Sequence, residues 1–158
     1  LLKSIKLIKS NFKIKLLIIG KGNNKMLLKN YIIQNKLQNR VKLLGYLGNP
    51  FPYIQMSDIV VLTSKFEGLP NILLEAQYLK KYIISTDCPT GPKEILLNGK
   101  AGDLIRIGDF KKLSFLISNY YKRKKIIIKK INTGKKNFFR FDYNLNCKKY
   151  LEFVIKNV

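Results

Sequence analysis

The sequence predicts an α/β fold, a Rossmann-like parallel sheet with flanking helices. Two observations favour this class: short apolar runs rich in β-branched residues recur along the chain, and longer segments with helical spacing separate them. With 158 residues and a hydrophobic fraction of 46%, the chain can bury one ordinary core. We expect this domain in residues 1–121, and a basic helical extension in residues 122–158 that packs on the same domain.

Five apolar runs are predicted to be strands. Each is rich in Ile, Leu or Val, as is typical of strands that are buried on both faces of a parallel sheet. Gly20 and Gly45 end the first two of them. The predicted strands span residues 14–19, 41–44, 58–63, 82–86 and 102–107.

Helices are expected before and between these runs, where apolar residues recur at helical spacing. Pro70 fits the first position of its helix, and Asp109 fits an N-cap. The remainder of the chain, to Val158, is expected to be helical with a break near residues 132–134. The other predicted helices span residues 1–10, 24–37, 50–56, 70–79, 92–97 and 109–121.

The formal net charge of +22 limits the partners that we expect. Such a charge could serve to bind nucleic acid, an anionic membrane surface or an anionic small ligand. Because Lys, Ile and Asn are all in excess along the whole chain, compositional drift is the favoured cause, and a basic membrane-facing surface comes next. No nucleic-acid partner is expected, since the sequence has no helix-turn-helix, zinc-finger, KH or RNP-like pattern.

Two further features bear on metals and location. The chain has no His, and Cys88 and Cys147 are isolated, so the sequence indicates neither a metal site nor a disulfide framework. The apolar runs are far shorter than the roughly 20 residues that cross a bilayer, and no signal peptide is recognisable. We expect a cytoplasmic protein, with peripheral attachment to the inner face of the cell membrane as an additional expectation.

The most informative segment is residues 64–76, which places Glu67 and Glu75 around a Gly-Leu-Pro turn that opens a helix. Gly68 permits close backbone approach, and the free amides of a helix start can hold an anion such as a diphosphate. A carboxylate in the second turn can accept hydrogen bonds from vicinal hydroxyls like those of a ribose. Alternatively, both acids only complement the positive helix end, an effect of about 0.3 to 1 kcal/mol. Their spacing alone leaves both interpretations open.

The loops that follow the first four predicted strands are expected to meet at one edge of the sheet. Parallel sheets bind ligands at the carboxyl ends of their strands, so one crevice could collect all four loops. A glycine at a strand end more often serves a turn than a ligand. The loops carry Gly20 and Gly22, Gly45 and Tyr46, residues 64–71, and residues 87–91.

Residues 16–109 resemble the C-terminal, donor-binding half of the retaining, GT-B-fold glycosyltransferases of family 4. Five segments in order carry this resemblance: LIIGKG at 17–22, VKLLG at 41–45, SD at 57–58, EGLPNILLEA at 67–76 and TDCPTGPKEIL at 86–96. The residues of the last segment resemble those of a bacterial subgroup of the family. Enzymes of this subgroup build cell-surface or lipid-carrier-linked glycans from UDP-sugars, often N-acetylhexosamines. Glu94 matches the family pattern as well, although it could equally be an acid at a helix start.

The resemblance implies transfer of a hexosyl or N-acetylhexosaminyl group from a UDP-sugar to a glycan or lipid-linked acceptor, with retention. It implies no cofactor and no essential metal. It implies that Glu67 is the catalytic residue and contacts the donor sugar, and that Glu75 binds the ribose hydroxyls. The remaining donor-binding residues that it implies are Gly20, Gly22, Gly45, Tyr46, Ser64, Gly68, Leu69, Pro70 and Asn71.

The sequence departs from the family in one respect. Members have, upstream of the region that matches Leu1, a first strand, an Arg and a Lys that clamp the diphosphate, and a complete N-terminal domain that binds the acceptor. None of these is present in this sequence, so we expect a domain that lacks its first strand, either a fragment or the product of a truncated gene, and that is inactive alone.

A function of a different class also remains open. The chain could be a non-catalytic basic module that binds an anionic membrane or polyanion, although a simple amphipathic helix with solvated lysines explains the same pattern. The residues concerned are the run 122–125, Lys129, Lys130, Lys135 and Lys136.

Overall fold

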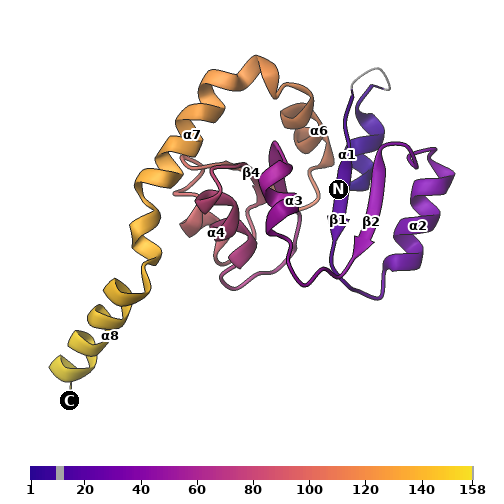
Figure 1. Ribbon diagram of the computed structural model, residues 1–158. Coiled ribbons are helices and arrows are strands. Elements are labelled where there is room, and N and C mark those ends of the chain that lie inside the picture. Colours follow the sequence, from indigo (N-terminus) through magenta and orange to yellow (C-terminus); the bar gives the residue numbers. More distant parts are fainter. Residues whose placement is uncertain (10–12, 158) are drawn as a thin grey trace.

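The computed structural model describes residues 1–9 and 13–157 and has an α/β architecture, as predicted (Figure 1). Its strands lie in two parallel sheets: β1 (Leu16–Ile19) pairs with β2 (Val41–Gly45), and the second sheet has the order β3-β4-β5 (Ile59–Leu62, Tyr82–Thr86, Asp103–Ile105). All five predicted strands are confirmed. The two sheets do not pair with each other, because no described strand lies between β1 and β3.

The predicted helices before residue 121 are also confirmed, with shorter ends. Asp109 is the N-cap of α6, where its side chain accepts a hydrogen bond from the Lys112 amide at 2.8 Å. Pro70 lies one position before α4, because its ψ of 101° is extended and Asn71 is the first helical residue. The first predicted helix reached Ser10, which lies outside the described residues. The helices are α1 (Leu2–Leu7), α2 (Lys25–Gln34), α3 (Phe51–Met56), α4 (Asn71–Tyr78), α5 (Pro92–Ile95) and α6 (Phe110–Ser118).

Strand β4 lies at the centre of the core, and all five of its residues are buried. Because side chains alternate along a strand, its neighbouring residues enter two different clusters. Ile84 packs with Ile5 and Leu113, from α1 and α6. Ile83 packs with Leu73 and Ile95, from α4 and α5. The two clusters therefore cover opposite faces of β4.

The break predicted near residues 132–134 is wrong. After the short 3-10 helix η1 (Tyr121–Arg123), α7 (Lys124–Lys136) runs through Gly134. This helix ends at Lys136, before the 3-10 helix η2 (Phe138–Phe141). Gly134 lies against Gln77 of α4, where an added Cβ would be 3.2 Å from Gln77 Nε2. This glycine allows close packing between α7 and α4 and does not end the helix.

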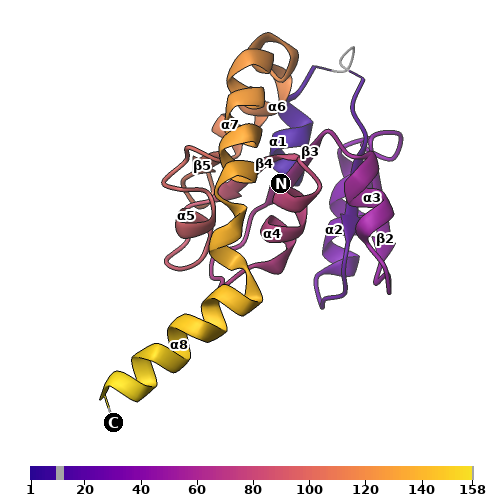
Figure 2. The same ribbon diagram turned by 60° about the vertical axis from the view of Figure 1, so that its left-hand side comes forward.

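The last helix, α8 (Tyr143–Asn157), projects away from the rest of the molecule in both views (Figures 1 and 2). None of its residues is buried, and Leu151, Phe153 and Ile155 are exposed. The packing that we expected for residues 122–158 therefore differs from the structure at α8, because its apolar residues find no described partner in the core. Among the described residues, no helix combines the length and the apolar character that crossing a membrane requires.

A polar cluster attaches α7 to the edge of the sheet. Asp103 of β5 accepts hydrogen bonds from the Tyr82 hydroxyl and from Arg123 Nη2, the latter at 3.1 Å. Lys130 of α7 lies 3.4 Å from the Asp103 carboxylate and donates to the Gly102 carbonyl at 2.8 Å. Burial alone would raise the pKa of Asp103, but the hydrogen bond from Tyr82 and the charges of Lys130 and Arg123 outweigh burial and hold this pKa below its ordinary value.

We predict that Asp103→Asn lowers the free energy of unfolding by about 2 kcal/mol near neutral pH, because charged hydrogen bonds of this kind contribute about 1.5 to 3 kcal/mol. Since the folded-state pKa is depressed, this stabilisation is present above the unfolded pKa of about 3.9 and is lost as the pH falls through the folded-state value. Urea unfolding of both proteins across this pH range measures the difference. Glu152→Gln is the control, because Glu152 is exposed on α8 and its ion pair with Lys148 should contribute little. A difference between wild type and Asp103→Asn that does not change with pH would contradict the assignment.

Candidate functional site

The loop after β3 and the start of α4 carry the two acids that the sequence singles out. Glu67 and Glu75 are half-buried, whereas Gly68 and Asn71 are exposed. Glu75 lies in the second turn of α4, next to the fully buried Ala76, which faces the core. The two carboxylates therefore flank an accessible glycine turn at the carboxyl end of a parallel strand.

The start of α4 has no side-chain cap. Pro70 occupies the N-cap position, and its side chain has no acceptor for the first helical amides. The first amides of a helix have no intrahelical partner, and the helix dipole favours negative charge beside them. An anion such as a phosphate group is the kind of ligand that suits this position.

Two threonines, one at the end of β4 and one in the loop that follows it, hold the loop that carries Glu67. Thr86, at the end of β4, is buried and donates from its hydroxyl to the Ser64 carbonyl at 2.6 Å. Thr90 donates in the same way to the Glu67 carbonyl. This segment belongs to the family pattern, but the roles of the two hydroxyls were not predicted. The signal in the sequence was a pair of threonines at and after the end of a predicted strand.

A glycine contact fixes the same two loops more tightly. Gly91 has a φ of +81°, and an added Cβ would lie 2.0 Å from the Gly68 carbonyl oxygen and 2.5 Å from Pro70 Cδ. Both the dihedral angle and the space therefore require glycine at this position. The backbone of the second loop rests directly on the Gly-Leu-Pro turn.

The predicted residues after β1 and β2 form a second group. The Gly20 amide donates to the Gly45 carbonyl at 2.7 Å, and the Lys21 ammonium lies 4.6 Å from the centre of the Tyr46 ring. The Tyr46 side chain is 65% exposed. Gly22 is exposed as well, and an added Cβ there would meet nothing within 4 Å.

The structure thus places the predicted site residues in two groups on two sheets. Gly20, Gly45 and Tyr46 are neighbours on the first sheet, and residues 64–71 with Glu75 are neighbours on the second. The single crevice that we expected would need these sheets to be joined.

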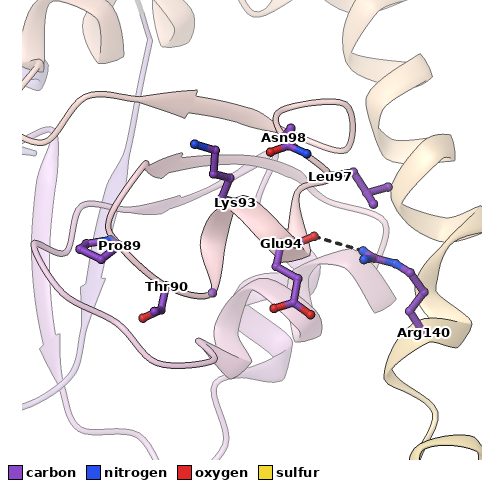
Figure 3. Close-up of a pocket in the computed structure, with 8 residues that line it drawn as sticks. Pro89, Thr90, Lys93, Glu94, Leu97, Asn98 and Arg140 are labelled. Atoms are coloured by element: carbon purple, nitrogen blue, oxygen red, sulfur yellow. Dashed lines mark hydrogen bonds between the residues drawn. The ribbon is translucent and has the colours of Figure 1, made fainter.

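A cavity of about 450 Å³ lies beside the loop that carries Glu67 and Gly68 (Figure 3). Arg140 reaches it from η2 and donates to the Glu94 carbonyl at 3.2 Å (Figure 3). Lys93 pairs with Asp87 at 3.7 Å, but both side chains are exposed, so this pair should contribute little. Neither Glu67 nor Glu75 lines this cavity, whose lining residues are Pro89, Thr90, Gly91, Lys93, Glu94, Leu97, Asn98 and Arg140.

Comparisons with known proteins agree on one class of enzyme. The chain is 49% identical over 82 residues to an uncharacterised glycosyltransferase of Methanocaldococcus jannaschii, a match that covers 52% of this chain and 20% of the relative. It is 30% identical over 124 residues to the lipopolysaccharide 1,6-galactosyltransferase of Escherichia coli K12, covering 76% of this chain and 34% of that enzyme. The chain therefore spans about a fifth to a third of the length of these curated relatives.

Solved structures share the fold. Staphylococcus aureus TarM, in a complex with fondaparinux, α-GlcNAc-glycerol and UDP, matches with a TM-score of 0.85 at 22% identity, over 95% of this chain and 31% of TarM. Anabaena HepE in complex with UDP matches with a TM-score of 0.85 at 16% identity, over 100% of this chain and 44% of HepE. The fold is thus that of part of a GT-B glycosyltransferase, as predicted. The model of the family "Glycosyl transferases group 1" matches residues 1–122, and the chain belongs to this family.

Proposed function

We propose that this chain is the donor-binding part of an enzyme that transfers a hexosyl or N-acetylhexosaminyl group from a UDP-sugar to a glycan or lipid-linked acceptor, with retention. The observation that carries the proposal is the pair of half-buried carboxylates, Glu67 and Glu75, on either side of the uncapped start of α4. The solved complexes of TarM and HepE with UDP support a UDP-sugar donor. A galactosyltransferase and an N-acetylgalactosaminyltransferase among the relatives support the sugar classes.

Each part of the site has a proposed role. Glu75 accepts hydrogen bonds from the ribose hydroxyls, and Glu67 contacts the donor sugar. The amides at the start of α4 face the diphosphate, on which negative charge develops as the sugar departs, and oriented dipoles stabilise that charge. The nucleobase lies beside Gly45 and Tyr46. Gly20 and Gly22 have no side chains, so the nucleotide can approach the backbone there.

The chain alone should bind the donor without transferring sugar. Departure of the diphosphate calls for positive charge at the phosphates, and Lys21, a cation in the loop after β1, lies over the Tyr46 ring. Acceptor binding is proposed to reside in the rest of a longer enzyme. We propose that transfer uses neither a cofactor nor an essential metal.

A peripheral location at the cytoplasmic membrane face is a second proposal. The structure favours α8 as the contact with anionic lipid, because this helix exposes apolar and cationic side chains together. By contrast, Lys130 of α7 is engaged with Asp103 and Ile127 is buried in the core. The α8 residues concerned are Lys148, Lys149, Tyr150, Leu151, Phe153, Ile155 and Lys156.

We predict that Glu75→Ala weakens UDP binding by about 10- to 150-fold, because a carboxylate that accepts ribose hydrogen bonds contributes about 1.5 to 3 kcal/mol. Calorimetric titration of the chain with UDP and with 2′,3′-dideoxy-UDP tests the assignment. The wild type should prefer UDP, and Glu75→Ala should bind both nucleotides equally. If the variant still prefers UDP, or if only its stability changes, Glu75 stabilises the start of the helix and does not bind the ribose. Glu152→Ala, on exposed α8, is the control.

We predict that Gly91→Ala lowers UDP affinity by at least about tenfold, because the new Cβ must displace the Gly68 carbonyl and the turn at α4. Gly108→Ala is a matched control: Gly108 also has a positive φ, of +83°, but an added Cβ there meets nothing within 4 Å. Both variants should therefore carry a similar backbone strain, whereas only the first should alter UDP binding in the same titration. Equal affinities of the two variants would contradict a role for the Gly91 contact in shaping the site.

We predict that the chain floats with vesicles that contain anionic phosphatidylglycerol and not with pure phosphatidylcholine, and that salt weakens binding because the attraction is electrostatic. Phe153→Asp should reduce the bound fraction severalfold. The charge-reversal pair Lys124→Glu and Lys125→Glu on α7 serves as the comparison and should have a smaller effect. Binding that depends on α7 and not on α8 would contradict the proposed contact.

A further inference from the structure

The loop after β1 holds a lysine between two glycines. Lys21 follows Gly20, which has a φ of +134°, and precedes Gly22; an added Cβ at either glycine would meet nothing within 4 Å. Lys21 is exposed, and it forms no ion pair with any residue that the structure describes. Its side chain can therefore change position without displacing neighbouring side chains.

The ammonium of Lys21 rests on an aromatic ring of the neighbouring loop. It lies 4.6 Å from the centre of the Tyr46 ring, directly after β2. Both side chains are exposed, and a cation–π contact is weak at an exposed site. A base that stacks on an aromatic side chain gains more than an exposed cation does. A nucleobase at Tyr46 should therefore displace the ammonium from the ring face.

The arrangement of the strands places Lys21 on the path of the nucleotide. A cavity of about 530 Å³ opens between β1 and β3, so β1 is the strand of the first sheet that borders the second sheet (Figure 1). A nucleotide that reaches from Tyr46 to the start of α4, as in the proposed function, must cross the loop after β1. Lys21 thus lies on the side of Tyr46 from which the phosphates would approach.

We propose that Lys21 is a further donor-binding residue, which leaves the Tyr46 ring when the nucleobase stacks there and binds the diphosphate with its ammonium. This inference rests on the proposed function. The exchange is favourable because a charge-assisted hydrogen bond to phosphate is stronger than the contact with the ring. In the complex, the charge of Lys21 lies where negative charge develops as the sugar departs. The same exchange favours nucleoside diphosphates over nucleosides.

The test is Lys21→Met, which should change the affinities for uridine and for UDP in opposite directions. Uridine should bind about two- to fivefold more tightly, because no ammonium competes for the ring. UDP should bind more weakly, and the ratio of UDP affinity to uridine affinity should fall at least about tenfold, because a charged contact with the diphosphate is lost. NMR titration of the full chain with each ligand measures both affinities. Lys29→Met, on exposed α2, is the matched control: it removes the same charge and should leave the ratio unchanged.

A second readout follows the lysine side chain directly. In the empty chain, the Tyr46 ring current should shift the NMR signals of the Lys21 ε-methylene protons upfield, and binding of uridine or UDP should remove this shift. Tyr46→Leu should abolish the shift in the empty chain. In that background, Lys21→Met should no longer strengthen uridine binding. Lys21→Arg should keep the wild-type ratio, since Arg retains the charge and can also lie over a ring.

Two results would overturn the inference while leaving the donor site intact. One is a ratio of affinities that Lys21→Met changes no more than Lys29→Met does. The other is an upfield shift of Lys21 that persists with UDP bound, which would mean that the base leaves this face of the ring to the ammonium; it is measured on the wild type and needs no variant to fold. A wild-type chain that binds neither uridine nor UDP would instead refute the proposed function, and this inference with it.

Discussion

Burial of β4 on both faces is the constraint on which the rest of the structure depends. Ile83 and Ile84, adjacent in sequence, are both fully buried, in clusters on opposite faces. This arrangement places α4 and α5 on one face and α1 and α6 on the other, and it sets the loops after β3 and β4 side by side. The hydrogen bond from Thr86 and the contact between Gly91 and Gly68 follow from that adjacency. The candidate site is therefore positioned by the core, while its residues lie in loops.

Several of the few acids of this strongly basic chain occupy positions with specific roles. Asp103 joins β5 to η1 through Arg123 and to α7 through Lys130. Asp109 begins α6 in the same way that Asp142 begins α8, where its carboxylate accepts a hydrogen bond from the Leu145 amide at 2.8 Å. Against this background, the half-buried pair Glu67 and Glu75 is notable because neither carboxylate forms an ion pair among the described residues. Carboxylates of this kind are suited to bind hydroxyls of a ligand.

Sequence patterns predicted the elements well and their partners less well. The five strands were predictable because each is a distinct apolar run, and the Asp109 cap because its residue type is selective for that position. The division into two sheets was not, since periodicity does not specify which strands pair. The break near Gly134 was predicted wrongly because a glycine that ends a helix and one that allows close packing look alike in sequence. The pattern of α8 predicted a helix but could not say what its apolar residues contact.

The division of the sheet bears directly on the proposed donor site. Gly45 and Tyr46 lie on the first sheet and Glu75 on the second, so a nucleotide that contacts all three bridges the opening between β1 and β3. Fixing the relative position of the two groups is then part of the ordering cost of binding. Linkage is reciprocal: if an ordered arrangement of the two sheets strengthens nucleotide binding, the nucleotide must favour that arrangement by the same factor. Donor recognition and the arrangement of the two sheets are then two parts of one equilibrium.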